Sequence, residues 1–322
     1  MPAVEADTLA LPRVERPELA ASVRPVIGVV DAPVTLEGEG FQVRRAFPGI
    51  DPSLTDPFLL LDHLGAVEYS PGEAKGAPDH PHRGFETVTY IMDGAIEHKD
   101  STGGGGVITD GATQWMTAGA GIVHSEMPTH ELLLKGGLFH GTQLWVNLPA
   151  SKKWSPPRYQ DIRGNDVRLL SSHDGASLIR LIAGDLGGRA GPGLTHTPIV
   201  YAHASIAPGA RLELPWPRDF NALAYVLSGR GTAGIGAVAL REGQLAVFGP
   251  GDAVVVAADE QQTSRAPRLE ILLLGGRPIR EQIAFYGPFV MNTREEIIQA
   301  IADYRAGRMG VIPPSRREVT TP

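Results

Sequence analysis

Two short stretches of the sequence place histidine and glutamate at alternate positions, a pattern that suits metal binding by neighbouring strands. The stretch DHPHRGFE holds His80, His82 and Glu86, and the stretch GAGIVHSE holds His124 and Glu126. Alternate residues of a strand face the same side. If the two stretches approach each other across a barrel interior, up to five ligand side chains converge there.

The available donor atoms define the chemistry of such a site. The chain contains no cysteine, which excludes thiolate ligands, Fe–S clusters and disulfides. Imidazole with carboxylate suits Fe(II), Mn(II), Ni(II), Cu(II) or Zn(II). Three histidines and one glutamate leave positions open on an octahedral ion, where O₂ and a substrate oxygen can bind. Strand geometry alone does not choose between Glu86 and Glu126, because both can face the right side.

Composition predicts an all-β protein of about two domains. The chain has 322 residues, with 39 glycines and 27 prolines, and this favours many short strands joined by tight turns. A helical pattern occurs only near the C-terminus, where Ile297, Ile298, Ile301 and Tyr304 recur at helical spacing. Asn292 or Thr293 can cap this helix and Gly307 can end it.

A weak internal repeat predicts two similar barrels. TYIMDG in the first half matches AYVLSG in the second. With Tyr90 aligned on Tyr225, His80 and His82 fall on Pro215 and Pro217. With Gly111 aligned on Gly243, His124 falls on Val256, so the second copy lacks metal ligands. The expected domains are an N-terminal arm (1–25), a metal-binding barrel (26–185), a barrel without metal ligands (195–290) and a C-terminal helix (291–310).

Charge and hydropathy limit the expected partners. The net charge is −7, with no cluster of basic residues, so direct nucleic-acid binding is not expected. No signal-peptide core and no apolar run of about 18 residues occurs, so we expect a cytoplasmic protein without a membrane interaction.

Several other residues invite a prediction. His63 and Arg83, which can orient a substrate, and the aromatic Trp115 are expected to line a substrate pocket. His98 is expected to face solvent. The glycine run at residues 103–106 lacks the context of a phosphate-binding loop and is expected to form a flexible hairpin tip.

Longer strings of the sequence resemble the pirin family of the cupin superfamily. They are HPHRGFETVTYIMDG, QWMTAGAGIVHSEMP, QLWVNLP, PPRYQDI and GPFVMNTREEI, and the resemblance extends over roughly residues 26–310. It implies a bicupin, with two tandem jelly-roll (double-stranded β-helix) barrels and one iron in the first. It also implies the ligands His80, His82, His124 and Glu126, and it leaves Glu86 as the runner-up.

The resemblance further implies a quercetin 2,3-dioxygenase type of oxidoreductase. Such an enzyme opens a flavonol-like ring with O₂, and Glu126 is the expected catalytic base. The expected cofactor is one divalent metal, Fe(II) first, with Mn, Ni, Cu and Zn as alternatives. The second hypothesis is an iron-dependent redox sensor that modulates a transcription factor or a metabolic enzyme. A metal-dependent isomerase or a sugar-binding cupin is a weaker third option, because one fold hosts many chemistries.

Overall fold

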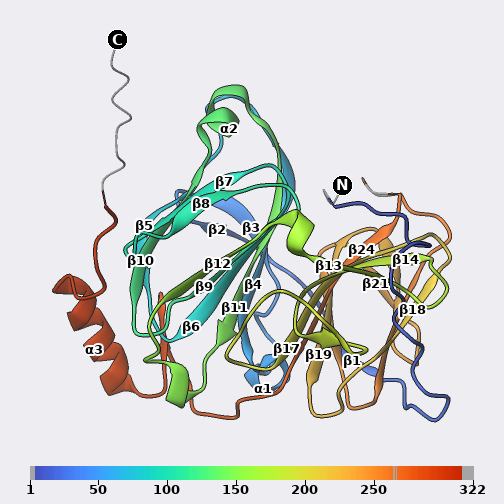
Figure 1. Cartoon of the computed structure of the whole chain (residues 1–322). Coiled ribbons are helices and arrows are strands. Elements are labelled where there is room, and N and C mark those ends of the chain that lie inside the picture. The colour runs from blue at the N-terminus through green and yellow to red at the C-terminus, as the bar shows by residue number, and fades with distance from the viewer. Residues whose placement is uncertain (1–3, 264, 266, 314–322) are drawn as a thin grey trace.

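The chain forms two β-barrels that lie side by side, as the computed structural model shows for residues 4–263, 265 and 267–313 (Figure 1). Each barrel combines a seven-stranded and a four-stranded sheet, and every pairing within them is antiparallel. The all-β expectation from glycine, proline and short apolar runs is therefore confirmed.

The first barrel has a large sheet ordered β12-β9-β6-β11-β4-β3-β2 and a small sheet ordered β5-β10-β7-β8. The bounds of these strands are β2 Val34–Glu37, β3 Phe41–Arg45, β4 Phe58–Tyr69, β5 Ala77–His82, β6 Phe85–Asp93, β7 Ile96–Asp100, β8 Gly105–Ile108, β9 Thr113–Thr117, β10 Ile122–Pro128, β11 Gly137–Asn147 and β12 Arg158–Ile162.

The second barrel has a large sheet ordered β1-β22-β19-β24-β17-β14-β13 and a small sheet ordered β18-β23-β20-β21. The bounds are β1 Val26–Asp31, β13 Arg168–Ser171, β14 Ser177–Ala183, β17 Ile199–Ile206, β18 Arg211–Pro215, β19 Asn221–Ser228, β20 Arg230–Ala233, β21 Val238–Arg241, β22 Gln244–Phe248, β23 Ala253–Ala258 and β24 Leu269–Gly276.

Short elements complete the fold. They are α1 Pro52–Thr55, α2 His130–Lys135, η1 Ala150–Lys152, η2 Gly164–Asp166, the ribbon β15 Asp185–Leu186 with β16 Arg189–Ala190, the hairpin β25 Ala284–Tyr286 with β26 Phe289–Met291, and α3 Arg294–Arg305. The predicted C-terminal helix is thus present. Thr293 caps it in a reciprocal capping box with Glu296. Ile297 and Ala300 are buried on its inner side, whereas Ile298 is exposed.

The two large sheets pack against each other through a shared apolar core. Tyr90 and Leu144 come from the first barrel, and Tyr201, Tyr225 and Leu272 come from the second. The outer face of each large sheet is therefore covered, which explains why its strands are buried on both sides.

The strand pairing interlocks the two halves of the chain. β1 pairs with β22, and β13 and β14 also join the second large sheet, so residues of the expected unit 26–185 contribute strands to both sheets. The N-terminal arm follows the second barrel, with bridges from Arg13 to Ser171 and from Val23 to Ala253. At the other end of the chain, a bridge joins Phe289 of β26 to Arg83 of the first barrel. The domain limits themselves stay a prediction.

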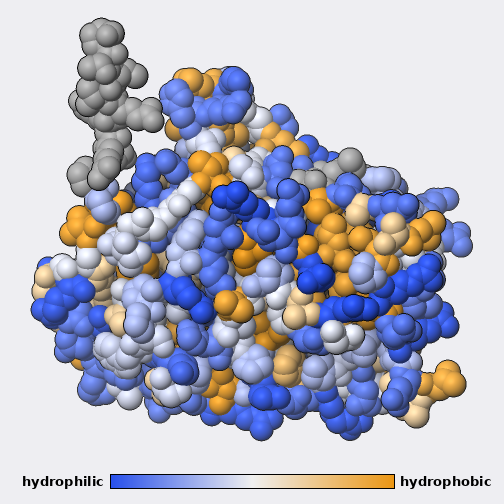
Figure 2. Space-filling view, viewed as in Figure 1, coloured by the Kyte–Doolittle hydropathy of each residue, from blue (hydrophilic) through white to orange (hydrophobic). Residues whose placement is uncertain are grey.

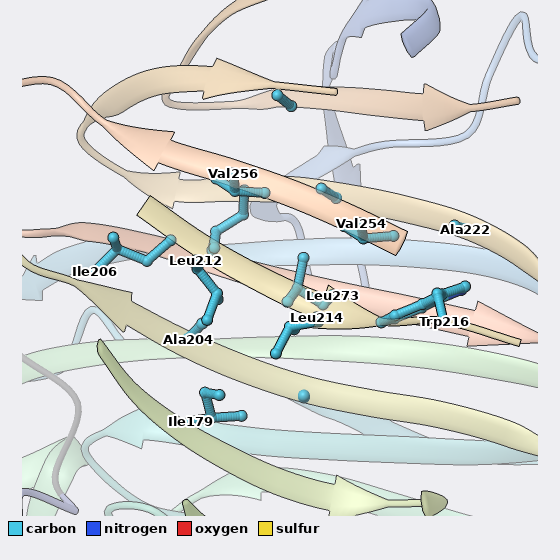
Figure 3. Close-up of a cluster of buried hydrophobic side chains, with 14 of the residues drawn as sticks. Ile179, Ala204, Ile206, Leu212, Leu214, Trp216, Ala222, Val254, Val256 and Leu273 are labelled. Atoms are coloured by element: carbon cyan, nitrogen blue, oxygen red, sulfur yellow. The ribbon is translucent and has the colours of Figure 1, made fainter. Parts of the chain in front are cut away.

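The second barrel is filled with hydrocarbon side chains (Figure 3). His124 pairs with His80 across β10 and β5, and in the second barrel Val256 pairs with Leu212 across β23 and β18. The same register matches His82 with Leu214. The prediction for Val256 thus agrees with the strand register, whereas Pro215 and Pro217 were wrong by three positions, because the two copies have loops of different length.

The face of the molecule seen in Figure 2 is largely polar. Figure 2 shows hydrophilic residues over most of the visible face, interrupted by smaller apolar groups. Within the part of the chain that is described, no helix has both the length and the hydropathy needed to cross a membrane.

Candidate metal centre

Strands β5 and β10 bring three histidines together inside the first barrel. His124 lies opposite His80, and Ile122 lies opposite His82. The ring centroids are 4.3 Å apart for His80 and His124, 4.9 Å for His82 and His124, and 4.8 Å for His80 and His82. One nitrogen from each ring lies within 4.8 Å of the other two, which is close enough for a single ion to be bound by all three.

Backbone carbonyls orient two of these rings. His80 Nδ1 is 2.7 Å from the carbonyl oxygen of Pro78, and His82 Nδ1 is 3.4 Å from that of Pro288. A carbonyl can only accept, so each Nδ1 donates its hydrogen and each Nε2 keeps a lone pair. This is the usual arrangement behind histidines that bind a metal.

His124 supplies the observation that tests the fit of a metal. The residue is fully buried, and its Nε2 has no hydrogen-bond partner among the residues that the structure describes. Burial, together with the neighbouring histidines, holds the pKa of its imidazole well below the ordinary value, and burial does the same for His82. Neutral imidazoles with free lone pairs are metal ligands, whereas an unpartnered buried nitrogen is otherwise costly. The residues present therefore fit a metal ion.

Glu126 lies next to this triad on β10. Its Oε1 accepts a hydrogen bond from Thr89 Oγ1 at 2.6 Å, and its Oε2 accepts one from Gln143 Nε2 at 3.2 Å. A carboxylate oxygen of Glu126 also forms a second close set with His124 and His98. The carboxylate is thus held at the edge of the triad by two neutral donors.

A cavity of about 400 Å³ opens from the triad. His80, His82 and Glu126 line it. The other lining residues include Thr89 and Gln143, the aromatic side chains of Phe41, Tyr69, Phe139, Trp145 and Phe285, and the charged side chains of Glu37, Arg45, Asp62 and Lys75. The volume lies within the range of about 300–1,000 Å³ that is usual for small-molecule sites.

Comparison with known proteins identifies the family. The Pirin profile matches residues 40–146, and the profile of the Pirin C-terminal cupin domain matches residues 201–310. Pirin of Homo sapiens is 39% identical over 85% of this chain and 90% of its own. The chain belongs to the pirin family.

Other relatives of this pirin carry an enzyme name. A Pseudomonas aeruginosa protein, provisionally named a quercetin 2,3-dioxygenase, is 41% identical over 84% of this chain and 93% of its own. The crystal structure of an Acinetobacter baumannii quercetin 2,3-dioxygenase superposes with a TM-score of 0.83 at 36% identity, over 91% of this chain and 100% of that one. The bicupin fold expected from the sequence is therefore confirmed.

Glu86 does not face the triad. Its oxygens accept hydrogen bonds from Thr117 at 2.7 Å and from Thr195 at 2.6 Å, and burial raises the pKa of its carboxyl group. Gly84, with φ of +91°, turns the chain between β5 and β6, so the alternation of His80 and His82 does not continue into β6. The expectation that Glu86 shares their face was wrong.

The three predicted pocket residues lie elsewhere. His63 bonds to His140 at 2.8 Å and to Tyr225 at 3.2 Å, on the side of β4 that faces the second barrel. Arg83 forms an ion pair with Asp303 of α3 at 2.7 Å. Trp115 belongs to the core between the large sheets. None of the three lines the cavity, because strand alternation directs them to other surfaces.

Sequence reasoning missed the side chains that do line the cavity. Gln143 lies opposite Thr89, and Trp145 lies two residues along the same strand, so all three face the interior. Their alternation in QLWVNLP and FETVTY was a usable signal. His98, which was expected to face solvent, is fully buried beside His124.

Proposed function

We propose that this pirin is a metal-dependent dioxygenase of the quercetin 2,3-dioxygenase type. The observation that carries the proposal is the cavity of about 400 Å³ that reaches His80 and His82. A redox sensor needs no open space at its metal, whereas a ring-opening enzyme must admit a flat aromatic molecule and O₂. The enzyme names of the relatives in Pseudomonas and Acinetobacter support the same reading.

The proposed ligands are the Nε2 atoms of His80, His82 and His124, together with Glu126. Fe(II) is the first metal to test, and Mn, Ni, Cu and Zn remain alternatives. An Escherichia coli pirin of the same fold was solved in complex with nickel(II), which makes nickel a necessary arm of the metal assay. A bound divalent ion would lower the pKa of a coordinated substrate hydroxyl.

The protein groups around the cavity have separable roles. Glu126 can take the hydroxyl proton of the substrate, because it lies at the triad and, within the described part of the chain, accepts side-chain hydrogen bonds from the neutral groups of Thr89 and Gln143. Trp145 packs on Phe85 with ring centroids 4.3 Å apart, which fixes an apolar wall beside His82. Such a wall favours a flavonol-like ring over a sugar.

The decisive experiment combines metal analysis with turnover. Protein purified without chelator should contain about one iron-group metal per chain and should consume quercetin in air with release of carbon monoxide. The His124→Ala variant should lose both the metal and the turnover.

A matched variant separates entry of the substrate into the cavity from metal binding. Leu64 lines the cavity but offers no ligand atom, so Leu64→Trp should keep the metal and lose turnover. Metal binding without turnover of quercetin or related flavonols in wild type would reject the dioxygenase and favour the iron-dependent sensing hypothesis. Absence of metal binding would reject the centre itself.

A further inference from the structure

A chain of buried groups lies behind His124. His124 Nδ1 is 3.3 Å from Nδ1 of His98, and His98 Nε2 is 3.3 Å from Oδ2 of Asp100. His98, Asp100 and His124 are each at most 1% exposed. Tyr159 stacks on His98 with ring centroids 5.1 Å apart, which helps to exclude water from these three buried groups.

The number of hydrogens shared among Asp100, His98 and His124 decides which imidazole tautomers satisfy these hydrogen bonds. Asp100 Oδ2 can only accept, so the hydrogen of a neutral His98 sits on Nε2 and its Nδ1 carries a lone pair. Gln114 Nε2 also donates to that lone pair, at 2.7 Å. His124 must then donate from Nδ1, which leaves the lone pair of its Nε2 free to face His80 and His82.

We propose that Asp100 and His98 are positioning residues that hold His124 in its metal-binding tautomer. The inference rests on the metal centre proposed above, and it assigns the two residues a role through His124 rather than on the metal or the substrate. The other close set, His98 with His124 and Glu126, does not favour His98 as a ligand, because both of its ring nitrogens are already hydrogen-bonded.

The glycine run in the β7–β8 hairpin fits this role. Asp100 Oδ1 accepts hydrogen bonds from the backbone nitrogens of Thr102 at 2.8 Å and Gly104 at 3.0 Å, and from Thr102 Oγ1 at 2.6 Å. A Cβ at Gly104 would lie 2.6 Å from Asp100 Oδ2, the oxygen that faces His98. The absence of a side chain at residue 104 therefore makes room for the carboxylate.

The first test exchanges one atom of Asp100. In Asp100→Asn, Oδ1 can keep the three donors of the hairpin, and the amide nitrogen then faces His98 Nε2. His98 is driven to the Nδ1–H tautomer, so His124 must accept at Nδ1 and carry its hydrogen on Nε2. Affinity for Zn²⁺, measured by competition with a chromogenic chelator, should fall about 10–100-fold, as for other partners of metal-bound histidines.

Imidazole tautomers give a readout that does not depend on activity. In ¹⁵N-histidine-labelled metal-free wild type, two-bond ¹⁵N–¹H correlation spectra should show His124 as Nδ1–H and His98 as Nε2–H. In Asp100→Asn both assignments should reverse. A merely structural role for Asp100 would not exchange the tautomers.

The second test moves Asp100 without changing any titratable group. Gly104→Ala should displace Oδ2 and lower the Zn²⁺ affinity. Gly106→Ala is the matched control, because a Cβ there meets only Tyr159 Oη at 3.7 Å, and it should bind as wild type does.

The outcomes separate this inference from the proposed activity. Wild-type affinity in both Asp100→Asn and Gly104→Ala, or a His124 that stays Nδ1–H in Asp100→Asn, would overturn the inference. A wild-type protein that binds Zn²⁺, shows the expected tautomers and fails to turn over quercetin would reject only the proposed activity.

Discussion

His124 and His80 lie directly opposite each other across β10 and β5, and the equivalent pair in the second barrel is Val256 and Leu212. The same strand pairing thus surrounds a cluster of imidazole nitrogens in one barrel and a hydrocarbon core in the other. The second barrel can therefore be perturbed without touching the candidate metal centre.

Truncation in the second barrel should destabilise the protein and leave metal binding intact. Leu214 is fully buried in that core, so Leu214→Ala should lower the free energy of unfolding by about 2–5 kcal/mol in urea titrations. Ile235→Ala, at a site that is 70% exposed, should change it little. A loss of metal stoichiometry in folded Leu214→Ala would contradict this separation.

Replacement of Glu126 should separate catalysis from metal binding. Glu126→Gln keeps the three histidines, so the protein should still bind a metal, while kcat for quercetin falls about 10²–10⁴-fold as expected for a lost general base. Glu68→Gln, at an exposed site on β4, is the control. Full turnover in Glu126→Gln would remove Glu126 from the mechanism.

Metal removal should lower thermal stability in wild type only. A ligand that binds the folded state alone adds about 2.7 kcal/mol at a concentration of 100 times Kd. Calorimetry of chelator-treated wild type should therefore show a Tm that rises on addition of Fe(II) or Zn²⁺. His124→Ala should show no such rise, since Nε2 of His124 belongs to the triad.

Lys153 should make the free energy of unfolding depend on pH in the alkaline range. Its Nζ donates to Gly84 O, Asn147 Oδ1 and Val290 O at 2.7–2.9 Å, and burial lowers its pKa from 10.5 to about 8. Between these values the unfolded chain holds a proton that the folded chain has released, so stability should rise with pH across this window.

Urea titrations from pH 7.5 to 10.5 measure this rise. The component due to Lys153 should vanish in Lys153→Met, which has no titrating group, and in Lys153→Arg, which stays charged throughout the range. Equal pH slopes in wild type and both variants would show that Lys153 titrates normally.

The sequence was sufficient for the fold class and for the shared face of His80 and His82, because both depend on local patterns. The approach of His124 to this pair was an assumption about two distant strands, and the pairing of β10 with β5 bears it out. Short apolar runs with glycine turns predict strands, and alternation within HPH places His80 and His82 on one face. The cap candidate Thr293 likewise marks the start of α3, where the structure confirms it. These features need no knowledge of distant contacts.

Predictions that depended on a side chain's face or on a distant partner were less successful. Glu86 was misplaced because Gly84 interrupts the alternation. His63 follows Asp62, which lines the cavity, and a shift of one residue moves a side chain to the opposite face. The burial of His98 depends on contacts with His124 and Gln114, which only the folded barrel brings together.

The hairpin β25–β26 supplies part of the wall of the cavity at the candidate metal centre. Gly287 and Pro288 belong to the cavity wall, and Pro288 orients His82, yet both lie near the end of the chain. During translation, chains are synthesised from the N-terminus at about 5–20 residues per second. The wall that Gly287 and Pro288 contribute can therefore form only after β25 and β26 have been synthesised, well after β5 and β10. Full enclosure of the candidate metal centre therefore depends on a segment that is made much later than the three histidines.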